Sequence, residues 1–329
     1  DKSVLKARTM INMDSEDEGV ATVSCAGGLR VQFTKEIKRT TVQGSLLTLK
    51  VEGLLGGHSG QDIDKERQNA DLLMARMIQR LLKETKGQLV SFNGGTKDNA
   101  IPRECEASLI YESDEEAAKA EELACELAET YAEELTPAEP DFSCEISCET
   151  NRTAEAIPQD AAKEFICAMR LAPNGIQKRN IKMDGFVVVS LNLGVVRTEE
   201  DRIVMIFSPR SSVASLQEDT KERLNTLAET FGFTVSHSSE YPGWSFKEDS
   251  PVREICKESY KELFGEDLKI EAIHAGLECG LFSDAIKGLD AIAIGPTIAN
   301  CHTPDEYLTL DSFERFYEFL KDILSRLAK

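Results

Sequence analysis

Two long apolar runs lie close together near the middle of the chain, "GFVVVSLNLGVV" (185–196) and "DRIVMIFSP" (201–209). Both read as strands because they are rich in β-branched residues. A helical pattern follows over about 212–231, and then comes another strand-like stretch, "FTVSHSSEY" (233–241). This succession of strands and helices is typical of a sheet covered by helices on one face.

The same alternation continues upstream of these strands. The half-buried pattern of "SLLTLKVEG" (45–53) indicates a strand, and apolar residues recur at helical spacing from Asp62 to Glu84. Further strands are predicted at 88–95, 103–112 and 141–149, and further helices at 114–135 and 159–171. We therefore expect residues 29–245 to form an α+β domain with a mostly antiparallel sheet.

The two ends of the chain differ from the middle and resemble one α/β domain. Strands are predicted at 9–13 and at 19–28, the second closing on a glycine turn. After Ser250, a predicted helix cap, strands at 268–273 and 289–295 alternate with helices. A capping-box-like start at Asp311 and Glu314 opens the last helix. Its predicted apolar face comprises Phe313, Phe316, Tyr317, Leu320, Ile323, Leu324 and Leu327. We expect an α/β domain, residues 1–28 and 246–329, interrupted by the α+β domain.

Composition excludes several classes of function. The chain has 329 residues and a net charge of −20, which disfavours binding to nucleic acid or to an anionic membrane surface. No apolar run is long enough for a membrane helix. The nine cysteines are scattered without a disulfide framework, which is typical of a reducing compartment and predicts a cytoplasmic protein. The sequence contains no phosphate-loop, dinucleotide-binding, HExxH or GxSxG pattern.

Two candidate metal ligands follow predicted strands. Asp14 comes directly after strand 9–13, and His302 lies in "GPTIANCHTPDEY" (295–307) after strand 289–295. Open α/β sheets place ligand-binding side chains at such strand ends, and carboxylates and imidazoles both bind divalent metals. A solvated acidic turn and an ordinary loop histidine are the alternative interpretations. Another histidine, His58, lies in the glycine-rich turn "LLGGHSGQD" (54–62).

Other polar residues are candidates for binding or chemistry. Arg210 ends a predicted strand, where a guanidinium can grip a carboxylate with two hydrogen bonds or form a surface ion pair. Asn99 lies in a loop whose glycines allow close approach of a ligand, although its amide can also stabilise a turn. In "HAGLECG" (274–280), His274 and Cys279 raise the alternative of a thiol nucleophile with a histidine base.

Five stretches together resemble a known family, the aminoacyl-histidine dipeptidases, which are carnosinase-like di-zinc exopeptidases. The stretches are "NMDSEDEG…CAGG", "GLLGGHSGQDI", "FNGGTKDNAIPRE", "HAGLECGLF" and "GPTI…CHTPDE", in this order from residue 12 to residue 306. The resemblance implies metal-dependent hydrolysis of Xaa-His dipeptides. It also implies a catalytic α/β domain interrupted by a lid domain that forms a homodimer.

The resemblance further implies roles for individual residues. Asp14 matches a carboxylate ligand of one of two metal ions, expected to be zinc, and His302 matches the imidazole ligand of the other. His58 matches the lid histidine that helps to hold the oxyanion of the tetrahedral intermediate. Asn99 and Arg210 match contacts to the substrate's backbone and carboxylate. His274 and Glu278 fall in the family stretch that lines the cleft.

The family's remaining metal ligands and its general base lie upstream of the position of Asp14, in a region that this sequence does not contain. Because water activation needs a metal in defined coordination with a base nearby, we expect a C-terminal fragment that is inactive alone. Two alternatives remain. One is a non-catalytic dimerisation or binding module that retains the lid, and the other is thiol hydrolysis through Cys279.

Overall fold

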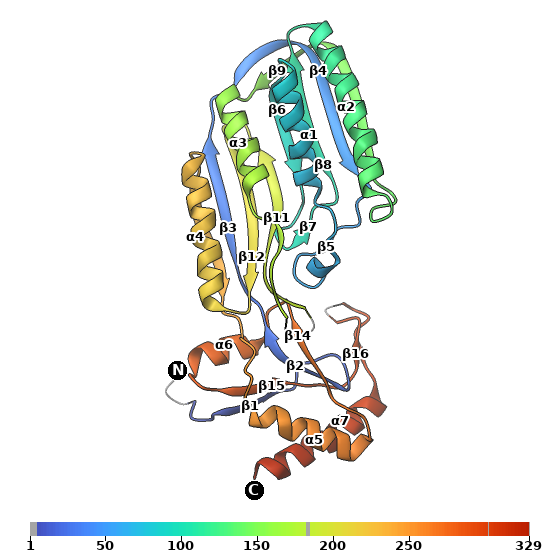
Figure 1. The fold of residues 1–329 in the computed structure, drawn as a ribbon, viewed down its shortest axis with the longest axis vertical. Coiled ribbons are helices and arrows are strands. Elements are labelled where there is room, and N and C mark those ends of the chain that lie inside the picture. The colour runs from blue at the N-terminus through green and yellow to red at the C-terminus, as the bar shows by residue number, and fades with distance from the viewer. Residues whose placement is uncertain (1–4, 182–184, 302, 329) are drawn as a thin grey trace.

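The computed structural model describes residues 5–181, 185–301 and 303–328. Figure 1 shows an elongated molecule in which a large sheet occupies the upper part and a small sheet the lower part. The small sheet is formed by segments from both ends of the chain, and the large sheet by the middle. No described helix is long and apolar enough to cross a membrane.

The large sheet has nine strands, in the order β13-β3-β12-β11-β6-β8-β4-β9, with β10 paired to β11. Every pairing in it is antiparallel, as the sequence predicted. The strands are β3 (Gly27–Glu36), β4 (Thr40–Glu52), β6 (Gln88–Gly94), β8 (Cys105–Tyr111), β9 (Ser143–Ala156), β10 (Gly175–Asn180), β11 (Phe186–Thr198), β12 (Arg202–Ser211) and β13 (Thr234–Tyr241).

Four helices cover one face of this sheet (Figure 1). They are α1 (Ala70–Glu84), α2 (Asp114–Leu135), α3 (Gln159–Leu171) and α4 (Ala214–Thr230). The apolar face of each packs onto alternate strand residues, so that one continuous core forms with fully buried aromatic rings such as Phe33, Phe92, Phe165 and Phe207. The rings of Phe92 and Phe165 meet edge to face, with centroids 5.4 Å apart.

The small sheet has the order β1-β15-β2-β14. Its strands are β1 (Thr9–Asn12), β2 (Val20–Cys25), β14 (Lys269–Ile273) and β15 (Asp290–Ala293). β1 is parallel to β15 and β14 is parallel to β2, whereas β15 is antiparallel to β2. The helices here are α5 (Pro251–Phe264), α6 (Glu278–Ala285) and α7 (Leu310–Leu327). The combination of parallel and antiparallel strands with these helices is consistent with the predicted α/β character.

Two pairs of short strands and one 3-10 turn complete the described fold. β5 (Gly57–His58) pairs with β7 (Ala100–Ile101), and β16 (Ile298–Ala299) pairs with β17 (Tyr307–Leu308). A 3-10 turn, η2 (Ile63–Lys65), precedes α1.

Several predicted boundaries were wrong. The helix predicted from Asp62 begins only at Ala70, because the side chain of Asn69 accepts hydrogen bonds from the backbone of Asp71 and Leu72 and caps it there. The glycine turn predicted at the end of 19–28 is instead the start of β3. A Cβ on Gly27 would lie 2.4 Å from the backbone nitrogen of Gly243, so these glycines serve close backbone packing rather than a turn.

The last helix also differs from its prediction. Its N-cap is Thr309 and no side-chain cap bond forms, so the predicted capping box of Asp311 and Glu314 is wrong. Within the predicted apolar face only Phe316 and Ile323 are buried, together with Phe319, which the prediction did not include. Other members of that face, including Phe313 and Leu324, remain exposed.

The two sheets are joined where the chain crosses between them. Cys25 and Trp244 form an isolated antiparallel bridge, with N–H···O=C distances of 3.0 and 2.9 Å. The hydroxyl of Ser24 donates to the carbonyl of Trp244 at 2.7 Å, and the amide of Ala26 donates to the carbonyl of Ala275. These contacts tie the outgoing and returning segments of the chain to each other.

Candidate functional site

The loop that carries Asp14 lies beside the loop that leads to residue 302. Because β1 and β15 are parallel neighbours, the loops that follow them leave the same edge of the small sheet. The amide of Ile294 donates to the carbonyl of Asn12 at 2.9 Å, and that of Ile298 donates to Glu16 at 2.9 Å. Asp14 itself is exposed between these contacts.

The approach of the two loops depends on Gly295. A Cβ on this glycine would lie only 1.8 Å from the carbonyl oxygen of Ser15, so a larger residue must push the loops apart. We expect Gly295→Ala to lower the free energy of unfolding by about 2–3 kcal/mol, as overpacking does. Urea unfolding measures the change, and Ser15→Ala, which keeps the carbonyl, serves as control. An unchanged midpoint would contradict the observed loop packing.

The second predicted metal ligand, His302, lies outside the described residues. Cys301 precedes it in the sequence and hydrogen-bonds to the side chain of Glu16. Desolvation, and next this hydrogen bond, raise the pKa of the Cys301 thiol. Cys301 therefore contacts a residue that lies two positions after Asp14 in the sequence. Within residues 5–181, 185–301 and 303–328, no three His, Cys, Asp or Glu side chains form a group that could hold a metal ion.

The turn that carries His58 is fixed by backbone hydrogen bonds. His58 pairs with Ala100 in the β5–β7 ladder, and the amide of Ser59 donates to the carbonyl of Asn99 at 2.9 Å. The ring nitrogen Nδ1 accepts from the amides of Gly60 (3.2 Å) and Gln61 (3.0 Å). In the neutral ring the proton is therefore on Nε2, which makes this half-buried atom a hydrogen-bond donor.

Gly60 brings His58 next to His274, which belongs to the small-sheet part of the chain. A Cβ at position 60 would lie 2.3 Å from the carbonyl oxygen of His274 and 3.1 Å from Cε1 of His58. His274 is only 6% exposed, and its Nε2 lies 2.7 Å from the hydroxyl of Ser190. The two histidines thus meet where the large and small sheets face each other.

Arg210 completes this cluster. It pairs with Ser190 across β11 and β12, and its Nη1 donates to the hydroxyl of Tyr241 at 2.9 Å. The side chain is 7% exposed, and its Nε has no hydrogen-bond partner among the residues that the structure describes. A buried guanidinium without a carboxylate partner is costly, so the cluster favours binding an anionic group.

The electrostatics of the cluster agree with its geometry. Burial, and next the positive charge of Arg210, lower the pKa of His274 to about 3. Burial and Arg210 also lower the pKa of His58, although Asp62 opposes the shift. Both rings are therefore neutral near pH 7, while Arg210 supplies the fixed positive charge.

The depressed pKa of His274 makes stability depend on pH. The unfolded ring, with a pKa of about 6.5, binds a proton more readily than the folded ring. This contribution to stability is therefore complete above about pH 6.5 and is lost as the pH falls toward 3. It amounts to roughly 3–5 kcal/mol at most. We expect urea unfolding between pH 7 and 4 to show a shallower pH dependence for His274→Gln than for the unmodified chain. Identical slopes would contradict this assignment.

The remaining candidates divide into two groups. Asn99 is exposed beside His58, and Asn192 supports its loop by donating to the carbonyl of Ala100 at 2.8 Å. Glu278 is exposed at the start of α6. Its negative charge helps to raise the pKa of the Cys25 and Cys279 thiols. The structure thus groups His58, Asn99, Arg210 and His274, and places Glu278 beside these cysteines instead.

The thiol alternative is contradicted. Cys279 is fully buried, and burial raises the pKa of its thiol to about 12, so the thiolate needed for attack does not form near neutral pH. The Nε2 of His274 is engaged by Ser190 rather than by Cys279.

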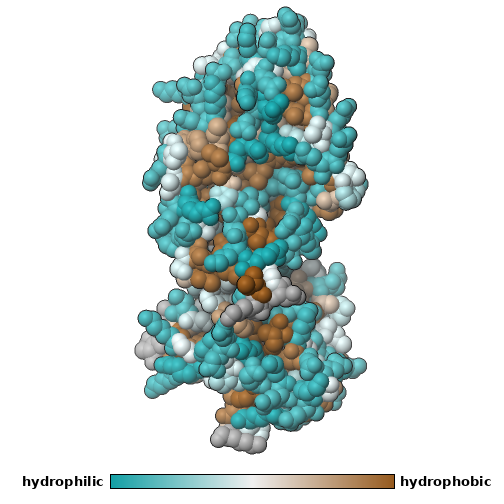
Figure 2. Space-filling model, in the orientation of Figure 1, coloured by the Kyte–Doolittle hydropathy of each residue, from teal (hydrophilic) through white to brown (hydrophobic). Residues whose placement is uncertain are grey.

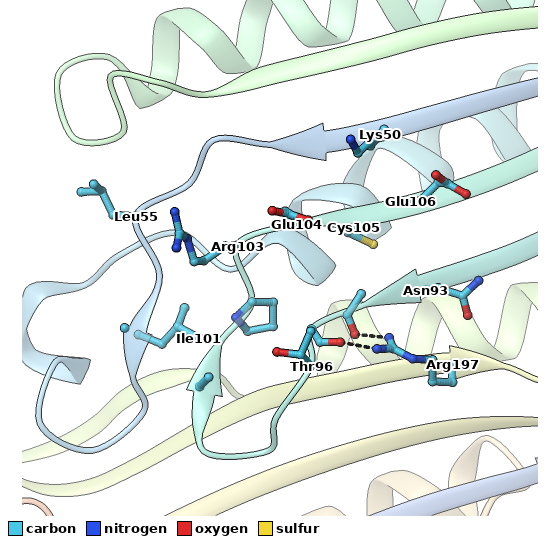
Figure 3. A pocket seen from close by; sticks show the side chains of 15 residues that line it. Lys50, Leu55, Asn93, Thr96, Ile101, Arg103, Glu104, Cys105, Glu106 and Arg197 are labelled. Atoms are coloured by element: carbon cyan, nitrogen blue, oxygen red, sulfur yellow. Dashed lines mark hydrogen bonds between the residues drawn. The ribbon is translucent and has the colours of Figure 1, made fainter. Parts of the chain in front are cut away.

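A cavity of about 760 Å³ adjoins the β5–β7 pair, and Figure 3 shows the residues that line it. Its wall includes Gly57 and Ala100 of the β5–β7 pair, and Lys50, Arg103 and Arg197 contribute positive charge. The guanidinium of Arg197 donates hydrogen bonds to the carbonyl oxygens of Gly94 and Gly95.

The sequence predicted neither this cavity nor the contacts of Ser190 and Tyr241, because contacts between strands depend on the register in which the strands pair. The one sequence signal was a serine inside the apolar run of β11.

Fold and site together place the chain in a known class. Residues 86–326 match the model of peptidase family M20/M25/M40, and the chain belongs to this family. The match covers most of the large sheet and the whole C-terminal segment of the small-sheet region.

Two relatives are more particular. The chain is 33% identical over 329 residues to a cytosol non-specific dipeptidase of Escherichia coli, covering 98% of this chain and 67% of the relative. It also resembles the crystal structure of an aminoacylhistidine dipeptidase from Vibrio alginolyticus, with a TM-score of 0.93 and 33% identity, over 98% of this chain and 66% of that one. The chain thus spans about two thirds of the length of each.

Proposed function

We propose that the chain carries the lid and part of the catalytic domain of a metal-dependent dipeptidase for Xaa-His dipeptides. The lid is residues 29–245, and the partial catalytic domain is residues 1–28 and 246–329. The observation that carries this proposal is the joint match to two dipeptidases at 33% identity, one of them with a TM-score of 0.93.

The cluster around Arg210 supports recognition of a dipeptide's terminal carboxylate. Its guanidinium offers the unpartnered Nε in a protein whose net charge is −20, so a fixed local positive charge is needed to hold an anion there. Ser190 and His274 lie beside it and supply polar atoms from the two sheets. We propose that Asn99, on the loop paired with His58, contacts the peptide backbone of the substrate.

His58 is suited to stabilising an oxyanion. Its Nδ1 is held by two backbone amides, so the proton on Nε2 is fixed in place before substrate arrives. A donor fixed in this way stabilises charge that develops on the carbonyl oxygen during attack without having to reorganise.

We propose two zinc ions as the cofactors, with Asp14 and His302 as one ligand each. The described residues do not fit a complete metal site, since Asp14 has no group of further donors around it there. When bound, zinc would activate water for attack on the peptide bond. This chain's described residues would bind, orient and stabilise the substrate.

The isolated chain is expected to be inactive. Purified chain with added zinc should hydrolyse neither Ala-His nor carnosine above the rate of a buffer control, because the residues that the structure describes include no group of three possible metal donors. Release of free histidine, followed by chromatography, measures this. Turnover that disappears with a chelator would contradict the expectation of an inactive fragment.

The alternative of a non-catalytic binding or dimerisation module is favoured by the same incomplete metal site. Activity of the chain once it is completed by the remaining third of the family fold would exclude it.

We also propose a cytoplasmic location and a homodimer formed through the lid. The nine free cysteines and the cytosolic relative support the location.

A further inference from the structure

Glu139 is one of three acidic side chains that are buried among the residues the structure describes, together with Asp71 and Asp290. The other described acidic residues are exposed or half-buried, and Figure 2 shows that hydrophilic residues cover much of the visible face. Glu139 is 2% exposed, although it lies in the turn between α2 and β9. A buried carboxylate is costly unless hydrogen bonds replace its lost water, so its partners indicate what it holds in place.

Both carboxylate oxygens of Glu139 bind the backbone of one loop. Oε2 accepts a hydrogen bond from the amide of Leu55 at 2.7 Å, and Oε1 accepts one from the amide of Gln68 at 2.8 Å. These amides lie at the two ends of residues 55–68, the loop that contains His58 and η2. One carboxylate therefore closes the loop at its base, as in compact surface loops whose ends meet.

Two arginines hold the carbonyl groups on either side of Leu55. Nε of Arg103 donates to the carbonyl of Leu54 at 3.0 Å. Nη1 of Arg67 donates to the carbonyl of Gly56. Three successive residues after β4 are thus held by charged side chains, whose hydrogen bonds are stronger than those between neutral groups.

The position of Glu139 is itself fixed by the turn from α2 to β9. Its amide donates to the carbonyl of Leu135 at 2.9 Å, and its carbonyl accepts from the amide of Phe142 at 3.2 Å. The turn packs on the end of β4, since a Cβ on Gly53 would lie 1.8 Å from the carbonyl oxygen of Asp141. Figure 1 shows the turn at the lower end of α2, next to the segment that carries β5.

We propose that Glu139 is a positioning residue, which closes the loop of residues 55–68 and thereby holds the ring of His58 in place. It acts through the loop backbone. Leu55 precedes His58 by three residues, and within the loop Oδ2 of Asp62 accepts from the amide of His58 at 2.8 Å. The importance of this positioning for catalysis rests on the proposed oxyanion role of His58.

The alternative is that Glu139 only stabilises the start of α1. Gln68 lies just before this helix, and a carboxylate near a helix N-terminus is favourable. The helix already has a cap, because Asn69 accepts hydrogen bonds from two amides of the first turn. The bond to Leu55, at the other end of the loop, has no part in α1.

Glu139→Gln tests the inference in the purified chain, because glutamine keeps the size of glutamate but has one oxygen for two amides. Hydrogen exchange followed by NMR should show the amides of Leu55 and Gln68 protected in the unmodified chain. In the variant, exchange of one of them should be at least about tenfold faster, as the loss of its acceptor predicts. The ring nitrogen shifts of His58, identified with His58→Ala, should move from the Nε2–H tautomer toward a mixture of tautomers.

Asp141→Asn is the matched control, since Asp141 is exposed in the same turn and its substitution removes the same charge. It should leave the exchange of residues 55–68 and the ring shifts unchanged. Glu139→Asp, which keeps both oxygens on a shorter side chain, should restore part of the protection that Glu139→Gln loses.

Two results in the purified chain would overturn the inference. One is rapid exchange of Leu55 and Gln68 in the unmodified chain, a measurement that does not depend on a variant that folds. The other is a Glu139→Gln chain that unfolds at a lower urea concentration while the ring shifts of His58 stay unchanged, since Glu139 would then be purely structural.

Kinetics separate this inference from the proposed function. In the chain completed by the remaining third of the fold, Glu139→Gln should lower kcat for Ala-His by about tenfold with little change in KM, because a misplaced catalytic group loses much of its effect. If His58→Ala lowered kcat and Glu139→Gln did not, the positioning role would be overturned. If His58→Ala left kcat unchanged while Glu139→Gln still altered the His58 ring, the oxyanion role would fail and the positioning of the ring would stand.

Discussion

His58→Ala is expected to lower kcat for Ala-His hydrolysis by about 10²–10³-fold, with little change in KM, in the chain completed by the remaining third of the fold. The reason is the fixed proton on Nε2, since two backbone amides hold Nδ1 and leave Nε2 as the donor. A donor that acts mainly on the developing oxyanion contributes to the transition state and little to ground-state binding.

The control for this variant is His237→Ala. His237 lies on β13 and is exposed, and its ring hydrogen-bonds to the side chain of Asn225 at 3.0 Å. It should leave kcat and KM unchanged. Equal loss of activity in both variants, or a His58 effect confined to KM, would remove His58 from the proposed oxyanion contact.

Arg210→Met is expected to reduce kcat/KM for Ala-His by about 10²-fold or more, mainly by raising KM. Removing one partner of a buried charge pair costs about 2–5 kcal/mol, which corresponds to such a factor. The methionine keeps an apolar stem of similar length but cannot hold a carboxylate. The unmodified enzyme should strongly prefer Ala-His over its C-terminal amide, and the variant should lose that preference.

Arg202→Ala is the matched control, since Arg202 lies on the same strand but is exposed and pairs with Glu199. It should retain both the activity and the preference. If the Arg210 variant still discriminated between the acid and the amide, another group would have to bind the carboxylate.

The sequence predicted much of the fold because its signals are local. The helices at 114–135 and 159–171 have the predicted bounds, since their apolar spacing ends at clear turns. The antiparallel sheet followed from the order of the elements, in which strands such as β11 and β12 follow each other without an intervening helix. The order of the strands could not be predicted, because β3 pairs with β12 and β13 across some 170–200 residues. Such pairings depend on the whole sheet rather than on neighbouring residues.

The candidate site was predicted in part for a similar reason. His58 and Asn99 were chosen from their glycine-rich turns, and the β5–β7 pairing brings those turns together. Ser190 and Tyr241 join Arg210 only through strand register and the return of the chain at β13, so no local pattern indicates them. The sequence also could not predict that α7 is only partly buried, because the spacing shows which residues are apolar but not which of them other elements cover.

The metal site that we propose has Asp14 and His302 as ligands. Zinc anomalous diffraction from crystals of the completed protein tests it most directly. The account predicts zinc within about 2.0–2.2 Å of an Asp14 carboxylate oxygen and of an imidazole nitrogen of His302. Zinc bound elsewhere, with both side chains free of metal, would contradict it.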